Sequence, residues 1–149
     1  MTRERVPASG TDAATAFSIV ERVRFGDLDA MQHLNNVESL RYFETARIAY
    51  LRDRLPEHDP AKRTTFGWIL AECSIKYRSP GVFDEDIRIF IRPGELRRSS
   101  FELLFEMRGE ADGRLVAEGS GTLVGYDYDA GRAAPIPDDV KERLAADAQ

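Results

Sequence analysis

Apolar residues alternate with polar residues along much of the chain, which is the period of a half-buried β-strand. The alternation begins at the odd-numbered positions Phe17, Ile19, Val23 and Phe25. Further β-rich runs follow at residues 66–77, 87–93, 99–108 and 114–128. The Asp112-Gly113 pair between the last two is typical of a hairpin turn. The pattern therefore predicts five strands.

Between the first and second strands, apolar residues recur three or four positions apart, as on one face of an α-helix. These residues are Val37, Leu40, Phe43, Ala46 and Tyr50. The spacing predicts a helix over residues 36–55, and further apolar residues in its second half predict that it is largely enclosed. Pro56 and the polar loop after it end this helix. A short second helix is predicted near the C-terminus, with Pro137 in its first turn.

This order of elements predicts an α+β fold. A five-stranded antiparallel sheet has an apolar face to bury, and the helix at 36–55 is the only large element available to cover it. The economical arrangement is a curved sheet wrapped around that helix. One helix cannot cover the inner face of five long strands, so pairing with a second copy of the chain is expected. Residues 17–149 are interpreted as a single domain, and residues 1–16 as a flexible tail.

Length and composition narrow the class of protein. A chain of 149 residues with 32% charged and 42% hydrophobic residues fits one soluble globular domain. Its net charge of −5 argues against a nucleic-acid-binding protein, and no apolar run is long enough to span a membrane. The N-terminus lacks the apolar core of a signal peptide. Because Cys73 is the only cysteine, no intramolecular disulfide can form, and a cytoplasmic location is expected.

Polar residues crowd the junction between the first strand and the helix, and two interpretations compete for them. In the structural one, Asn35 caps the helix with Glu38 as its acidic partner, and Asp27 and Asp29 lie in a turn. In the catalytic one, unpaired N–H groups at the helix N-terminus stabilise an oxyanion. A carboxylate then acts as general base or nucleophile. The chain offers no serine or cysteine with a matching base and no cluster with metal-ligand spacing, so a carboxylate is the strongest catalytic candidate.

The junction sequence FGDLDAMQHLNNVESLRYFETAR resembles the opening motif of hotdog-fold thioesterases of the 4-hydroxybenzoyl-CoA and long-chain acyl-CoA thioesterase type. In those proteins an aspartate closes a strand, a loop often reading His-Val-Asn-Asn follows, and the central helix carries an aromatic-x-Glu-x-Ala-Arg pattern. The counterparts here are Asp29, residues 33–36 and residues 42–47. The similarity continues in order to about residue 145, through IKYRSPGVFDEDIRIF, ELRRSSFELLFEM, GRLVAEGSGTLVGYD and PIPDDVKERL. It implies a hotdog fold and hydrolysis of an acyl-CoA to free acid and coenzyme A, without a metal or other cofactor.

Carried over by position, the resemblance assigns roles to the junction residues. Asp29 is the expected catalytic carboxylate, acting as general base or as nucleophile. The backbone N–H groups around Asn36 and Val37 are the expected oxyanion hole, and the Asn36 side chain has a supporting role. His33 is expected to position water or the loop. Asp27 is expected to be structural.

The resemblance also implies a contact for coenzyme A in the segment RRSS. Guanidinium groups suit phosphates, and backbone at a strand edge can pair with the pantetheine amides. The residues are Arg97, Arg98, Ser99 and Ser100. The structural alternative is two solvated arginines at the start of a strand, and Lys76 and Arg78 are weaker candidates of the same kind. Because the family builds its site at a dimer interface, a homodimer or homotetramer is expected.

Other functions compete with acyl-CoA hydrolysis. The same chemistry could act on an acyl-carrier-protein thioester, or the chain could be a silent protein that binds acyl-CoA. Asp29 favours an enzyme because no structural need for a carboxylate is evident there. Another hotdog branch has its catalytic glutamate at the position of Glu44. In this chain Glu44 is expected to be structural. Hotdog hydratases and dehydratases pair an aspartate with a histidine in a different local pattern. The acyl preference depends on a tunnel beside the helix, for which the candidate residues are Leu40, Phe43, Trp68, Leu70 and Tyr77.

Overall fold

The elements follow one another along the chain in the predicted order. The computed structural model describes residues 16–62 and 65–148. Apart from Ala16, the predicted tail at residues 1–16 lies outside the described residues. The elements are β1 (Phe17–Arg22), η1 (Phe25–Asp27), α1 (Asn36–Arg54), η2 (Pro56–His58), β2 (Phe66–Tyr77), β3 (Asp86–Leu96), β4 (Ser100–Gly109), β5 (Leu115–Asp127), β6 (Arg132–Ala133) and α2 (Asp138–Asp147).

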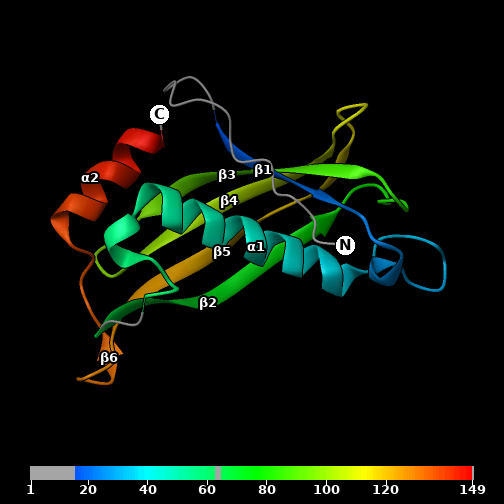
Figure 1. Ribbon diagram of the computed structural model, residues 1–149. Helices are drawn as coiled ribbons and strands as arrows, with labels where there is room; N and C mark the ends of the chain where they lie inside the picture. Colours follow the sequence, from blue (N-terminus) through cyan, green and yellow to red (C-terminus); the bar gives the residue numbers. More distant parts are fainter. Residues whose placement is uncertain (1–15, 63–64, 149) are drawn as a thin grey trace.

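Five long strands form one antiparallel sheet in the order β1-β3-β4-β5-β2. The sheet curls around α1, which lies across its inner face (Figure 1). The two-residue strand β6 pairs with the end of β5 and is not predicted by the alternation. The predicted α+β fold, a five-stranded antiparallel sheet wrapped around one long helix, is confirmed.

The core between α1 and the sheet is built from aromatic and branched side chains. Phe43 of α1 stacks on Phe105 of β4, with ring centroids 4.1 Å apart. Gly121 of β5 permits this close approach, because a Cβ atom there would lie 2.9 Å from the Phe43 ring. The alternating apolar residues of β3 and β4 are buried, as predicted: Ile87, Ile89, Ile91, Phe101, Leu103, Phe105 and Met107.

Some apolar positions of the pattern are exposed, contrary to prediction. β1 ends at Arg22, and Phe25 lies in the 3-10 helix η1 with an exposed fraction of 71%. The strand ends early because the Asp27 carboxylate accepts the backbone N–H of Arg24 and turns the chain. In α1, Val37 and Leu40 are also exposed, so the first turns of the helix are not enclosed.

β2 is the least covered strand of the sheet. Because α1 packs mainly against β1 and β3, the inner face of β2 remains open, and Leu70 and Tyr77 are both exposed. Within the described ranges 16–62 and 65–148, β2 pairs with no strand other than β5, so its other edge has no neighbouring strand. Long unpaired edges are normally covered or paired with another strand. The open edge therefore supports the expectation of a second copy.

The C-terminal helix α2 packs against β3 and is tied to the end of α1. Its residues Val140 and Leu144 are buried. The hydroxyl of Tyr50 donates to the Asp147 carboxylate at 2.5 Å, and the guanidinium of Arg54 donates to the same oxygen at 3.3 Å. These contacts fix the far end of α1, away from the junction loop.

Candidate active site

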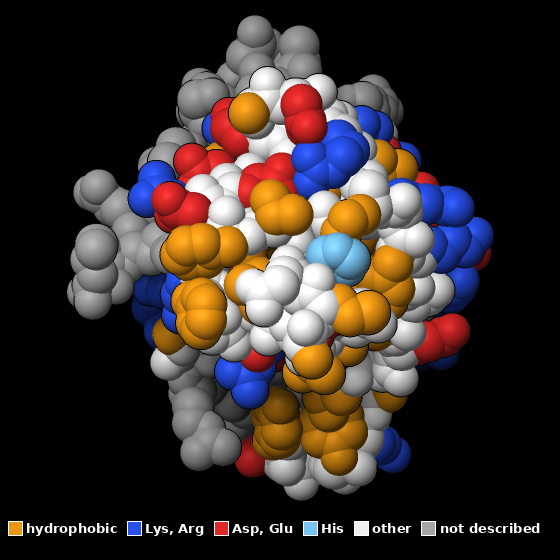
Figure 2. All heavy atoms as spheres, turned by 90° about the vertical axis from the view of Figure 1, so that its right-hand side faces the viewer, with side chains coloured by type: hydrophobic (Ala, Val, Ile, Leu, Met, Phe, Trp, Pro, Cys, Tyr) orange, Lys and Arg blue, Asp and Glu red, His pale blue; other side chains and the backbone are white. Residues whose placement is uncertain are grey.

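Two of the predicted catalytic residues, Asp29 and His33, lie in a loop between η1 and α1 at one end of the molecule, and the other two, Asn36 and Val37, begin α1. Leu28 and Leu34 form a β-bridge across the base of this loop. The N–H of Asp29 donates to the carbonyl of His33 at 2.8 Å, and the N–H of Gln32 donates to the carbonyl of Asp29 at 3.0 Å. Gln32 takes a left-handed φ of 67° to close the turn. Hydrophobic side chains gather on the surface at this end of the molecule (Figure 2).

The Asp29 carboxylate has a structural role in the turn where the sequence places it. Its Oδ1 atom accepts the backbone N–H of Met31 at 2.9 Å and that of His33 at 3.2 Å, which closes an Asx-type turn. Only Oδ1 makes these bonds, so they require an oxygen acceptor at this position but not a carboxylate. The second oxygen, Oδ2, accepts no hydrogen bond from any described residue. Asp29 is half-buried, so one oxygen holds the loop and the other remains available.

The start of α1 carries the predicted cap, but it offers fewer free N–H groups for an oxyanion than the sequence predicts. Oδ1 of Asn35 accepts the N–H of Val37 at 2.9 Å, which confirms Asn35 as the N-cap. The N–H of Asn35 donates to the carbonyl of Asp27 at 2.8 Å, so Glu38 does not complete a capping box. Because the cap already occupies the Val37 N–H, that group is not free to bind an oxyanion. The Asn36 N–H has no acceptor within the described part of the chain.

The two remaining predicted residues of the junction contact their surroundings through the backbone. His33 is half-buried, and its N–H and carbonyl both bond to Asp29, whereas its imidazole makes no hydrogen bond with the described residues. Asn36 is exposed, and its carbonyl accepts the hydroxyl of Tyr77 at 3.1 Å. This last bond ties the end of β2 to the first residue of α1.

Asp27 is buried beneath the loop and remains charged there. Burial raises the pKa of its carboxyl, but hydrogen bonds from Tyr42 and from the backbone and side chain of Arg24 outweigh burial and hold that pKa below its usual range. The same environment raises the pKa of the Tyr42 hydroxyl, through burial and through the neighbouring carboxylate. Asp27 is therefore an ionised acceptor at neutral pH, in line with its expected structural role.

Replacing Asp27 with asparagine is expected to flatten the loss of stability in acid. The pKa of Asp27 is lower in the folded protein than its ordinary value of 3.8, so the unfolded chain takes up this proton first as the pH falls. The stabilisation is complete above the unfolded-state pKa and is lost as the pH falls through the folded-state pKa. In urea unfolding, the free energy of unfolding should fall more steeply for the wild type than for Asp27→Asn below about pH 4. Equal slopes would show that Asp27 does not contribute to acid lability.

The predicted contact for coenzyme A lies at the opposite end of the sheet from the junction loop. Residues 97–100 form the turn between β3 and β4, where the N–H of Arg97 donates to the carbonyl of Ser100 at 2.8 Å. The carbonyls of Arg98 and Ser99 accept the N–H groups of Ile136 and Gly125. β3 has 11 residues, and at a rise of about 3.3 Å per residue it separates the two places by roughly 35 Å. One chain does not bring them together.

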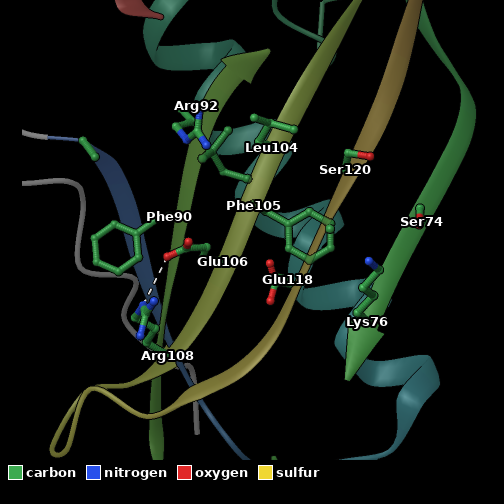
Figure 3. Close-up of a pocket in the computed structure, with 13 residues that line it drawn as sticks. Ser74, Lys76, Phe90, Arg92, Leu104, Phe105, Glu106, Arg108, Glu118 and Ser120 are labelled. Atoms are coloured by element: carbon green, nitrogen blue, oxygen red, sulfur yellow. Dashed lines mark hydrogen bonds and ion pairs between the residues drawn. The ribbon is translucent and has the colours of Figure 1, made fainter. Parts of the chain in front are cut away.

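The weaker candidates Lys76 and Arg78 flank Tyr77 at the junction-loop end of the sheet but belong to its outer face. A groove of about 540 Å³ lies on the outer face of the sheet. Lys76 of β2 lies on one side of it and Arg92 of β3 on the other, on the face opposite α1 (Figure 3). Arg78 pairs with Glu118, which lines the same groove, at 2.9 Å. These cations belong to a charged outer surface of the sheet.

The proposed tunnel residues divide into two groups. Leu40, Leu70 and Tyr77 are exposed and lie along the open side between α1 and β2, whereas Phe43 is buried in the core. Trp68 packs edge-to-face on Phe101, with ring centroids 5.2 Å apart. The open side, rather than the space beneath α1, is therefore the accessible apolar surface.

Glu44 lies on the exposed side of α1. It forms no ion pair with Arg47 or with any other described residue. The Arg47 guanidinium instead lies over the Phe43 ring, 5.1 Å from its centroid. Burial lowers the pKa of Arg47.

The sequence does not predict two contacts that hold the junction together. The Tyr42 hydroxyl donates to Asp27, and the Tyr77 hydroxyl donates to the Asn36 carbonyl. For Tyr42 the sequence holds a signal in its spacing. Tyr42 stands seven positions after Asn35, and two helical turns place both residues on one face of α1. For Tyr77 no local signal exists, since the contact depends on how β2 returns past the helix.

Two properties of the described residues bear on other kinds of site. No group of three or more His, Cys, Asp or Glu side chains within them could hold a metal ion. None of the helices in the same ranges is long and apolar enough to cross a membrane.

Comparison with known proteins adds to this geometry. The thioesterase-like superfamily matches residues 23–144. The long-chain acyl-CoA thioesterase FadM of Escherichia coli (strain K12) is 28% identical over 126 residues, which are 83% of this chain and 92% of FadM. A thioesterase from Thermus thermophilus, solved in complex with coenzyme A and Zn, is 31% identical, covers 88% of this chain and 92% of its own, and has a TM-score of 0.76. A thioesterase-superfamily structure from Jannaschia sp. CCS1 is 27% identical, with coverages of 97% and 94% and a TM-score of 0.83.

Proposed function

Because the chain belongs to the thioesterase-like superfamily and is a thioester hydrolase with the hotdog fold, we propose that it hydrolyses an acyl-CoA to the free acid and coenzyme A. The Thermus thermophilus thioesterase is complexed with coenzyme A, and the Escherichia coli relative is a long-chain acyl-CoA thioesterase. Both relatives support coenzyme A as the thiol part of the substrate. The proposed reaction uses no resident metal or cofactor.

Asp29 is the proposed catalytic carboxylate, and its free Oδ2 is the observation that carries the proposal. As general base, Oδ2 takes a proton from water while the water oxygen attacks the thioester carbon. As nucleophile, Oδ2 attacks that carbon itself and forms an acyl anhydride, which water then hydrolyses. In both routes the C–S bond breaks and the thiolate of coenzyme A leaves and takes up a proton.

The Asn36 N–H is the proposed donor to the oxyanion that forms in either route. It is the unbonded N–H in the first turn of α1 that follows the cap directly, and the positive end of the helix dipole adds to it. Asn35 fixes the direction of this turn by accepting the Val37 N–H. In this scheme His33 shapes the loop through its backbone bonds to Asp29, and its unbonded imidazole is a partner for water.

The test is release of free thiol from short, long and aromatic acyl-CoAs, followed with a thiol reagent. Turnover of at least one of them is expected. Turnover confined to acyl-carrier-protein thioesters would transfer the same chemistry to that carrier. Tight binding of acyl-CoA without any turnover would instead identify a silent binding protein, and the enzymatic scheme would be wrong.

A complete site is proposed to require two copies of the chain. Antiparallel pairing of two β2 edges, which have no neighbouring strand within the described residues of one chain, would place the Phe66 end of one strand beside the Tyr77 end of the other. The turn at residues 97–100 lies at the Phe66 end of the sheet, and the junction loop lies at the Tyr77 end. Such a dimer would bring the arginines of one copy toward Asp29 of the other.

Mixed dimers provide a direct test of this shared site. Asp29→Asn chains and Arg97→Ala/Arg98→Ala chains, co-expressed with different tags, should each form weakly active homodimers. The purified hybrid should recover about half the wild-type activity, because one of its two sites keeps both intact halves. A hybrid no more active than the two homodimers would place the whole site within one copy. A hybrid of two Asp29→Asn chains is the matched control.

A further inference from the structure

A buried hydrogen-bond network lies directly beneath the junction loop. Asp27 of η1 and Tyr42 of α1 are 3% and 4% exposed. The Tyr42 hydroxyl donates to Oδ2 of Asp27 at 2.5 Å, and it also lies 3.4 Å from the carbonyl of Arg22. The Arg24 guanidinium pairs with the same carboxylate at 3.2 Å. Neither Asp27 nor Tyr42 is therefore accessible to a substrate.

The backbone of Asp27 extends this network to the start of α1. Its carbonyl accepts the N–H of Asn35 at 2.8 Å, and Asn35 caps the helix through the N–H of Val37. Tyr42 lies two helical turns further along the same helix. The chain from Tyr42 to Asp27 to Asn35 thus forms a closed ring that begins and ends on α1.

The junction loop is anchored to this ring at both ends. It leaves at Asp27 and returns at Asn35, and Asp29 is two residues past the point of departure. A rotation of the backbone at Asp27 would therefore be passed directly to Asp29. It would also be passed to Asn36, because the Asp27 carbonyl holds the residue that precedes Asn36.

We propose that the hydrogen bond from Tyr42 to Asp27 is a positioning contact for catalysis, which holds Asp29 Oδ2 and the Asn36 N–H in their relative placement. The inference rests on the proposed function, because the proposed function gives these two atoms their catalytic roles. Displacement of reacting groups by about 1 Å can cost on the order of a hundredfold in rate. Groups that support a site through hydrogen bonds from rigid elements prevent such displacement.

The other end of α1 provides a matched control. Tyr50 is buried and donates its hydroxyl to Asp147 at 2.5 Å, the same distance as for Tyr42 and Asp27. Burial and a neighbouring carboxylate raise the pKa of both tyrosines. The Tyr50 bond secures α2 at the end of α1 away from the junction loop, so it measures the stability effect alone.

The experiment compares Tyr42→Phe with Tyr50→Phe in the full-length protein. Each change removes one hydroxyl and keeps the ring in the core. Tyr42→Phe is expected to lower kcat roughly tenfold or more with KM within about twofold of wild type. Tyr50→Phe should lower the melting temperature to a similar extent and leave kcat unchanged. Equal kcat values in the two variants would overturn the positioning role.

Amide hydrogen exchange supplies a readout that does not depend on turnover. The N–H groups of Met31, His33 and Asn35 are bonded to Asp29 or Asp27, so Tyr42→Phe should speed their exchange while Tyr50→Phe should not. Unchanged amide exchange in Tyr42→Phe would overturn the inference, whether or not the protein hydrolyses acyl-CoA. Faster exchange in Tyr42→Phe, together with a wild type that hydrolyses no thioester, would refute the proposed function and the catalytic purpose of the contact together.

A conservative change at Asp27 separates positioning from chemistry. An asparagine side chain would keep an oxygen acceptor for Tyr42, so Asp27→Asn should retain more kcat than Asp27→Ala and an unchanged pH profile. Equal losses of kcat in both variants, with a shifted pH profile of the residual activity, would mean that Asp27 takes part in proton transfer and is not a positioning residue.

Discussion

Replacement of Asp29 by asparagine is expected to lower kcat by about a thousandfold while the loop keeps its shape. Asparagine retains Oδ1, the atom that accepts the N–H groups of Met31 and His33. It replaces Oδ2, the proposed base or nucleophile, with an amide that can neither take a proton nor attack. The thiol-release assay, together with circular dichroism and the melting temperature, measures the two effects separately.

Asp127 offers a matched control for this variant. Its Oδ1 accepts two backbone N–H groups of its own turn, from Asp129 at 2.9 Å and Ala130 at 3.1 Å. Asp127→Asn therefore makes the same chemical change in the same kind of turn, far from the first residue of α1, and should keep wild-type turnover. Full activity in Asp29→Asn would remove Asp29 from the chemistry and make Glu44 the next carboxylate to test.

The largest expected effect on stability comes from Gly119→Ala. A Cβ atom at Gly119 would lie 2.0 Å from the backbone oxygen of Ser74 and 2.8 Å from the Phe105 ring. The Ser74 oxygen belongs to the neighbouring strand β2, so no side-chain rotation can relieve the clash. The free energy of unfolding should fall by about 3 kcal/mol or more, which corresponds to roughly 10 °C in melting temperature for a chain of this size.

Alanine substitutions at two other glycines should cost less stability and provide a comparison for this prediction. At Gly121 the Cβ would meet the Phe43 ring at 2.9 Å and the end of Leu70 at 3.0 Å, which are side chains that can shift, so Gly121→Ala should cost about 1 kcal/mol. At Gly26 nothing lies within 4 Å, and Gly26→Ala should change stability by less than about 0.5 kcal/mol. Urea unfolding of the three variants checks the order. A Gly119→Ala variant as stable as Gly26→Ala would contradict the close approach of β2 and β5.

The success of the helix and strand predictions has a local cause. A period of two or of 3.6 residues follows from backbone geometry, so the pattern in residues 36–55 and in β3 and β4 is visible without any tertiary contact. The cap at Asn35 is local too, because its side chain reaches the N–H two residues on. Phe25 fails the pattern because a carboxylate two positions later, at Asp27, bonds back to Arg24 and ends the strand.

The candidate site likewise has features that the local sequence predicts and features that it does not. The order of elements, the cap and the candidate Asp29 follow from the sequence and its resemblance to a family, since each depends on residues close together in the chain. The tertiary structure alone decided that the Tyr77 hydroxyl reaches the Asn36 carbonyl. It also placed residues 97–100 at the far end of the sheet. These facts depend on strand register and on the direction of single side chains in space, which no periodicity along the chain encodes.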